Sequence, residues 1–264
     1  MGSTNNIDLV SVVVPTYNRL DALQRVISAI RSQSCPNWEL IIVDDGSNSD
    51  QREFLRDIDE SDSRITILFQ ENQGPAVARN EGAKVASGEV IAFTDDDCYP
   101  PENWLDRLVW GYENYPSVAG VGGYIGPKKS VAEKNVFAKY HQFMNEKVYE
   151  MPDSPIIGGS DIPVGGTGSM SYRQDVFQEV GGFDESFPMA AGEDADLQKR
   201  IADRGYRLLF LPDKVAHLQQ YCLSQFVEES IRRGRGLFHF NQKHGSDRSP
   251  LRIVAGAVGS PITG

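Results

Sequence analysis

The chain has 264 residues, of which 24% are charged, and its net charge is −11. This acidity argues against a nucleic-acid partner. No apolar stretch reaches the roughly 18 residues that are needed to cross a bilayer, and the polar start lacks the apolar core of a signal peptide. The three cysteines stand at unrelated spacings and form no disulfide or zinc pattern. We therefore expect a cytoplasmic protein.

Strand and helix signals alternate over the first 125 residues. Helical spacing or a helix-starting proline predicts helices from Leu20, Pro75 and Pro101. Apolar runs that are typical of buried strands occupy residues 9–14, 39–43, 65–69, 90–93 and 118–121. Strands that alternate with helices predict an α/β fold with a doubly wound, mostly parallel sheet flanked by helices.

The pattern is less regular after residue 126. We expect a charged helix over residues 131–149, a short helix over 173–180, a helix over 193–204 and a strand over 207–211. Gly205 is well placed to end the third of these. The chain shows no internal repeat and no low-complexity tract, so we expect a single domain with two functional halves.

Polar loops follow three of the predicted strands, at residues 15–19, 44–47 and 94–97. Arg79 lies in the helix after the strand predicted at 65–69. In a doubly wound sheet, ligands bind at the carboxyl ends of the strands. Each feature also has a structural explanation: a turn, a helix cap, a solvated arginine or a wet acidic loop. Their shared position at one predicted edge favours a binding site.

The acidic triplet Asp95-Asp96-Asp97 needs a compensating charge. Two like charges about 4 Å apart repel by roughly 4 kcal/mol at an effective dielectric constant of about 20. Mg²⁺ and Mn²⁺ prefer oxygen ligands and are commonly held by carboxylates together with substrate phosphates. A metal-bound diphosphate would reconcile the triplet with Arg79, while Tyr17 could stack on a base and Asp45 could accept a base N–H.

Four motifs in order carry a family resemblance: VSVVVPTYNR, IIVDDGS, GPAVARNEG and FTDDD. Over residues 9–220 the chain resembles the inverting family-2 glycosyltransferases, which have the GT-A fold. The resemblance implies a nucleotide-sugar donor, usually a UDP-sugar, and a Mn²⁺ or Mg²⁺ cofactor. It implies donor-binding roles for Pro15, Thr16, Tyr17, Arg19, Asp45, Arg79, Asp95 and Asp96. Asp97 would bind the metal, and Asp95 or Asp96 the ribose.

Downstream residues resemble the family's acceptor side. Glu193 and Asp194 match an acidic pair, in which Asp194 would be the general base and Glu193 would orient the site; alternatively, both complement a helix dipole. His217 would be a further metal ligand, or a structural histidine. The segment Gly166, Thr167 and Gly168 would approach the acceptor, although its glycines could equally serve turns.

The resemblance divides the chain into a catalytic domain over 8–225, with halves 8–125 and 126–225, and a basic helical extension over 226–264. Residues 230–252 carry six Lys or Arg against one Asp. This region could close over the diphosphate, associate peripherally with the inner face of a membrane, or be a solvated helix. Processive members carry Gln-x-x-Arg-Trp nearby, whereas this chain has no Trp after residue 110, which favours a non-processive enzyme.

We therefore predict a metal-assisted, inverting transfer of a sugar to an acceptor hydroxyl. The acceptor could be a carbohydrate, a lipid-linked molecule or a protein. One alternative is a nucleotide-sugar-binding protein with an inactive site. A second alternative is a sugar nucleotidyltransferase. Such an enzyme normally has a glycine-rich phosphate loop after the first strand, whereas the loop here has no glycine, which disfavours this alternative. A structural or interaction domain is a third, which the four converging polar segments disfavour.

Overall fold

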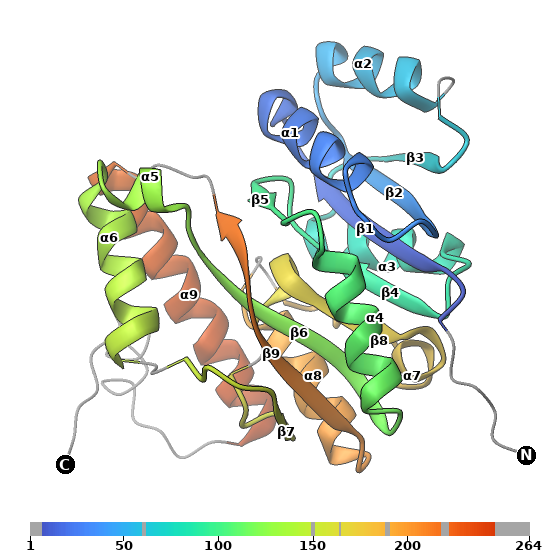
Figure 1. The fold of residues 1–264 in the computed structure, drawn as a ribbon. Helices are drawn as coiled ribbons and strands as arrows, with labels where there is room; N and C mark the ends of the chain where they lie inside the picture. The colour runs from blue at the N-terminus through green and yellow to red at the C-terminus, as the bar shows by residue number, and fades with distance from the viewer. Residues whose placement is uncertain are drawn as a thin grey trace, which may run out of the picture.

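The computed structural model describes residues 7–59, 62–148, 151–163, 165–187, 191–217 and 222–245. Within them, nine strands form one sheet in the order β3-β2-β1-β4-β8-β6-β9-β5, and β7 pairs with β9 (Figure 1). The strands are β1 (Val10–Thr16), β2 (Trp38–Asp45), β3 (Ile65–Gln70), β4 (Val90–Phe93), β5 (Cys98–Tyr99), β6 (Val118–Pro127), β7 (Ile156–Gly158), β8 (Met170–Arg173) and β9 (Arg207–His217).

Helices cover both faces of this sheet. The α-helices are α1 (Leu20–Arg31), α2 (Ser49–Asp59), α3 (Pro75–Val85), α4 (Trp104–Asn114), α5 (Lys129–Ala132), α6 (Val136–Phe143), α7 (Gln174–Glu179), α8 (Glu193–Asp203) and α9 (Leu223–His244). One apolar cluster packs α1, α2 and α4 on side chains such as Val12 of β1, and another packs α3, α7 and α8 on side chains such as Val13. The expected doubly wound architecture is confirmed.

The first four strands follow the sequence expectation closely. Strands β3, β2, β1 and β4 are parallel neighbours, and Val13 of β1 lies in register with Ile41 and Phe93. All seven residues of β1 are buried, which explains its continuous apolar, β-branched sequence. The carboxyl ends of β1, β2 and β4 therefore meet at one edge of the sheet.

The second half of the sheet is mixed. Strand β8 lies antiparallel between β4 and β6, whereas β6 and β9 are parallel. The strands predicted at 118–121 and 207–211 are longer than expected and run to Pro127 and His217. The register between β6 and β9 shifts opposite Pro212. Proline has no N–H to donate, and a bulge at this point does not require one, so β9 continues past the proline.

The single helix predicted over 131–149 is wrong. The chain instead forms α5, then α6, and then a π-helical turn over Met144–Val148. The break falls at Asn135, whose side chain accepts hydrogen bonds from the backbone N–H groups of Phe137 and Ala138. This side chain is a helix cap, so it starts a new helix where the sequence pattern suggested continuity.

Helix α9 has 22 residues and ends at Gly245, whose φ of +67° suits a glycine at a helix end. It lies beside α6 and packs on α8 (Figure 1). Residues 246–264 of the predicted basic extension lie outside the described residues. None of the described helices has the length and apolar character required to cross a membrane.

Candidate active site

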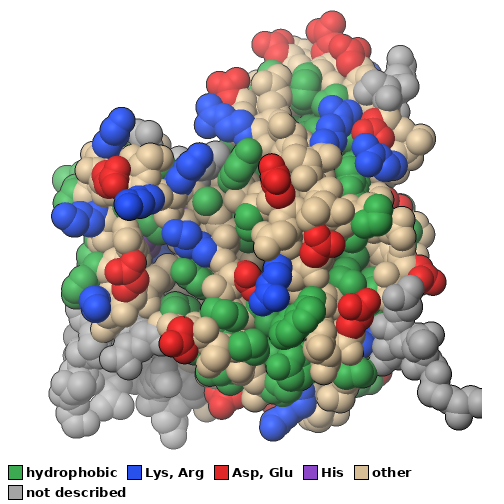
Figure 2. Space-filling view, in the orientation of Figure 1, with side chains coloured by type: hydrophobic (Ala, Val, Ile, Leu, Met, Phe, Trp, Pro, Cys, Tyr) green, Lys and Arg blue, Asp and Glu red, His purple; other side chains and the backbone are tan. Residues whose placement is uncertain are grey.

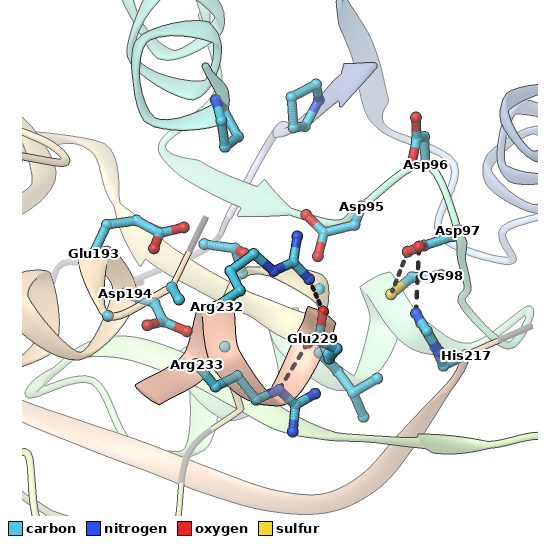
Figure 3. A pocket seen from close by; sticks show the side chains of 18 of the residues that line it. Asp95, Asp96, Asp97, Cys98, Glu193, Asp194, His217, Glu229, Arg232 and Arg233 are labelled. Atoms are coloured by element: carbon cyan, nitrogen blue, oxygen red, sulfur yellow. Dashed lines mark hydrogen bonds and ion pairs between the residues drawn. The ribbon is translucent and has the colours of Figure 1, made fainter. Parts of the chain in front are cut away.

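The polar loops converge on one cavity of about 1080 Å³ at the carboxyl ends of the strands (Figure 3). Every residue that the sequence singled out lines this cavity. They are Pro15, Thr16, Tyr17, Arg19, Asp45, Arg79, Asp95, Asp96, Asp97, Gly166, Thr167, Gly168, Glu193, Asp194 and His217. The expected spatial convergence is therefore observed, while the role of each residue stays a prediction.

The loop after β2 is fixed by hydrogen bonds. Asp45 is 5% exposed; its Oδ1 accepts from Gln70 Nε2 at 2.7 Å and from Gln73 N at 2.8 Å, and its Oδ2 accepts from Gly74 N at 2.9 Å. Asp45 thus joins the end of β2 to the start of α3. Both carboxylate oxygens are hydrogen-bonded within the protein, and Asp45 also lines the cavity.

Asp96 and Asp97 of the triplet share Arg19, but their other partners differ. Asp96 is almost fully buried and accepts hydrogen bonds from Thr16 Oγ1 at 2.9 Å and from Arg19 at 3.0 Å. Burial raises the pKa of Asp96 to about 6, against the lowering effect of Arg19. The partners of Asp96 come from β1 and its loop, so this aspartate mainly ties the triplet to the first strand.

Asp97 shares Arg19 and also contacts β9. Its Oδ2 lies 2.7 Å from Arg19 Nη1. The same oxygen lies 3.3 Å from His217 Nε2 (Figure 3). Burial alone would raise the pKa of Asp97, but the hydrogen bond from His217 and the positive charges nearby lower it to about 2. Asp97 is therefore ionised at neutral pH.

The donor set at this point suits a hard divalent cation. Single ligand atoms of Asp95, Asp97 and Cys98 lie within 4.8 Å of one another, and His217 adjoins Asp97. The Cys98 thiol is fully buried, and burial raises its pKa well above the usual value, so it stays protonated and is a weak ligand. Two carboxylates and an imidazole remain, a set that fits Mg²⁺ or Mn²⁺.

Arg79 connects the two sides of the cavity. Its buried guanidinium donates to Asp95 Oδ1 at 2.7 Å and to Glu193 Oε1 at 3.0 Å. Glu193 is 3% exposed; burial and the charge of Asp194 raise its pKa to about 7, although Arg79 acts in the opposite direction. Arg79 therefore holds a carboxylate of the triplet and one of α8 in fixed positions.

Asp194 lies at the start of α8, after Gly192, whose φ of +91° is accessible to glycine without strain. Its Oδ1 accepts from Ala195 N at 2.8 Å, and its Oδ2 lies against Gly166. A side-chain carbon at Gly166 would collide with Oδ2, so the glycine at this position allows Asp194 its place beside the cavity. Asp194 is more exposed than Glu193 and can meet a ligand directly.

Helix α9 supplies residues that sequence reasoning did not place. Gln225, Glu228, Glu229, Arg232 and Arg233 line the cavity. Both arginines pair with Glu229, as Figure 3 shows, and Arg233 Nε lies 2.8 Å from its carboxylate. The basic run was visible in the sequence, but its distance from the strand ends depends on how α9 packs, which no local signal specifies.

The fold and the site together define an α/β protein whose acidic ligand cavity lies at the carboxyl ends of a mostly parallel sheet. The family described as Glycosyl transferase family 2 matches residues 11–181, which is more than half of the chain, so the chain belongs to this family of enzymes. A second match, to the N-terminal domain of galactosyltransferase, covers residues 161–221. The recognition made from the motifs is confirmed at the family level.

Relatives and solved structures agree with this assignment. Glycosyltransferase AglE of Haloferax volcanii is 30% identical over 240 residues, which are 88% of this chain and 74% of AglE. The pre-mycofactocin glycosyltransferase of Mycobacterium tuberculosis is 29% identical over 94% of this chain, which spans only 51% of that protein. The mannosyltransferase PcManGT of Pyrobaculum calidifontis, solved with GDP-Man and Mn²⁺, superposes with a TM-score of 0.67 and 21% identity, over 95% of this chain and 68% of that chain. This likeness confirms the GT-A fold.

Proposed function

We propose that this protein is a non-processive, inverting glycosyltransferase that moves a sugar from a nucleotide-sugar donor to an acceptor hydroxyl. One observation carries the proposal: Asp95 and Asp97 face the same cavity as Asp194, with Arg79 bridging the two sides. Carboxylates that can hold a metal-bound diphosphate thus lie across one cavity from a carboxylate that can take a proton. The match to family 2 supports the same reading.

On the donor side, Tyr17 and Asp45 would contact the base, with Pro15, Thr16 and Arg19 around them. Asp95 would meet the ribose or the metal, because its side chain is 31% exposed whereas Asp96 is buried against Thr16 and Arg19. Bound at Asp95, Asp97 and His217, Mg²⁺ or Mn²⁺ would supply positive charge beside the departing diphosphate. PcManGT was solved with GDP-Man and Mn²⁺. GalNAc-T7, which superposes on this chain with a TM-score of 0.63 and 17% identity, was solved with UDP, GalNAc and Mn²⁺. We therefore include both a UDP-sugar and a GDP-sugar in the test.

On the acceptor side, Asp194 would accept the proton of the attacking hydroxyl. The new bond forms at the anomeric carbon while the bond to the diphosphate breaks, and the electron pair leaves with the diphosphate. A single displacement of this kind inverts the anomeric centre and needs no protein nucleophile. Glu193 acts through Arg79 as a positioning residue, and the turn at Gly166, Thr167 and Gly168 gives the acceptor access to Asp194.

The acceptor class stays open between carbohydrate, lipid-linked and protein acceptors. One relative, the glucosyl-dolichyl phosphate glucuronosyltransferase of Haloferax volcanii, is 32% identical over 181 residues and has a lipid-linked substrate in its name. This supports including polyprenyl-linked acceptors in a screen. We also propose the division into donor and acceptor halves at residue 125, with the catalytic domain extending to residue 225.

The test is transfer from UDP- and GDP-sugars to an acceptor panel with Mn²⁺, measured by release of nucleoside diphosphate and by NMR of the product. Asp194→Asn should lower transfer by roughly 10²–10⁴-fold and leave donor binding unchanged, because the amide cannot take the proton. Asp203→Asn, at the far end of the same helix, is the matched control and should be near normal. Transfer by Asp194→Asn at the wild-type rate, or a retained anomeric configuration, would contradict the proposal.

A further inference from the structure

Helices α6 and α9 carry an unusual amount of exposed apolar surface. Eleven large hydrophobic side chains are exposed among the described residues, and six of them lie on these two helices. The six are Val136, Phe143, Leu223, Val227, Ile231 and Phe238, with exposed fractions from 45% to 70%. Scattered apolar side chains are normal on a protein surface, but this concentration on two neighbouring helices is not.

The apolar residues of α9 form one stripe. Leu223, Val227 and Ile231 follow one another at intervals of four, and Phe238 follows seven residues later, so all four share a face of the helix. The side chains that line the cavity, among them Arg232, occupy a different face. The stripe is therefore not part of the cavity.

Helix α6 lies next to this stripe. Phe226 of α9 stacks on Phe137 at 4.8 Å and contacts Tyr140 at 5.6 Å, measured between ring centroids. The exposed Val136 and Phe143 lie seven residues apart, on one face of α6. The two helices thus form one packed pair with apolar side chains on its outer surfaces.

The same region is basic in an acidic protein. Residues 128–147 contain five Lys and two Glu, whereas the whole chain has a net charge of −11. Figure 2 shows Lys and Arg side chains gathered over α5 and α6. Lys128, Lys129, Lys134 and Lys139 are all exposed there. Positive charge next to exposed apolar side chains suits an anionic amphiphilic surface.

We propose that the outer surfaces of α5, α6 and α9 bind an anionic lipid bilayer. The apolar side chains would enter the interface while the lysines meet the head groups. A second copy of the chain fits this surface less well, because a two-fold contact would place one basic region against another. The inference goes beyond the proposed function and does not depend on it, although the cavity, lined by other side chains of α6 and α9, would then lie close to the membrane.

The experiment is cosedimentation of the full chain with vesicles of phosphatidylcholine alone and of phosphatidylcholine mixed with phosphatidylglycerol. We expect binding to the second vesicles only, weakened by salt. The triple variant Val227→Ser/Ile231→Ser/Phe238→Ser should lower the partition coefficient more than roughly tenfold, because its apolar contacts are lost. Lys134→Gln/Lys139→Gln should lower it by roughly tenfold.

Two controls keep the test specific. Val85→Ser and Lys84→Gln replace side chains of similar exposure on α3, and both should bind vesicles like the wild type. Circular dichroism checks that the variants fold. The proposal is overturned if the protein ignores anionic vesicles or if the triple variant binds them unchanged. A dimer in sedimentation velocity that the triple variant abolishes would also overturn it, in favour of a second copy.

Discussion

The two sides of the cavity are built in different ways. On the donor side, short loops after parallel strands hold their carboxylates by buried hydrogen bonds, as Asp45 shows with three of them. On the other side, α9 presents Arg232 and Arg233, which are about half exposed and share Glu229. Exposed ion pairs contribute little to stability, so these arginines can change partners at small cost. The donor side is therefore preorganised, whereas the side formed by α9 can adapt to a ligand.

The largest effect is expected at Arg79, which joins the acidic triplet to α8. Arg79→Ala should lower the free energy of unfolding by roughly 3–5 kcal/mol, because Glu193 and Asp95 lose their buried cation. Urea denaturation measures this. Arg107→Ala, which removes an equally direct but partly exposed pair with Asp213, is the control and should cost about 1 kcal/mol or less. Equal losses of unfolding free energy in the two variants would contradict a stabilising role for buried ion pairs of Arg79 with Asp95 and Glu193.

A smaller effect is expected from crowding Asp194, the carboxylate that we propose as the general base. Gly166→Ala places a methyl group against Asp194 Oδ2, so we expect the rate of transfer to fall roughly tenfold while nucleotide affinity is unchanged. Steady-state kinetics and calorimetry separate the two quantities. Gly159→Ala is the control, since a Cβ there meets only ordinary contacts from 3.4 Å. Loss of nucleotide affinity in Gly166→Ala would show that the surroundings of Asp194 also affect nucleotide binding.

The smallest effect concerns the attachment of α9. Asp184 accepts from Lys243 Nζ at 2.6 Å and from Ser186 N at 2.8 Å. Burial raises its pKa, but these hydrogen bonds and the charge of Lys243 lower it to about 2. The stabilising contribution of the ionised carboxylate is complete above its unfolded pKa of about 3.9 and disappears as the pH falls through about 2.

Asp184→Asn should therefore lower the thermal stability slightly at pH 6, and the difference from wild type should shrink as the pH approaches 2. Melting curves across this range measure it. Asp203→Asn, which removes an exposed carboxylate paired with Lys199 on α8, shows what the loss of a surface ion pair does by itself. A deficit in Asp184→Asn that stays constant down to pH 2 would mean that the Asp184–Lys243 pair is not its cause.

The donor side was largely predictable from the sequence. Runs such as Val10–Val14 are buried on both faces, and each ends in polar residues that must lie at the same edge once the strands are parallel. Local composition was therefore sufficient to predict both the strands and the edge of the sheet at which their loops lie. Which aspartate of the triplet is buried and which faces the cavity was not predictable. This depends on the hydrogen bonds of Asp96 with Thr16 and Arg19, which come from a distant part of the chain.

The later half was less predictable because its order depends on distant contacts. Strand β8 has four residues, and its place between β4 and β6 comes from pairing with segments far away in the chain. The apolar and charged pattern over 131–149 gave no sign of the helix cap at Asn135. This cap divides the segment into separate helices. The side chains of α9 reach the cavity only through its packing on α6 and α8.

The most direct test of the central claim is calorimetric titration of UDP and GDP, with and without Mn²⁺, on the wild type and on Asp97→Ala. Cys35→Ala, away from the cavity, is the control. We expect one nucleotide to bind tightly only with Mn²⁺, and Asp97→Ala to lose this dependence, because in the proposed site Asp97 would contribute an ionised ligand. Metal-independent binding of equal affinity in the wild type and Asp97→Ala would contradict the assignment of a metal-diphosphate site to the acidic triplet.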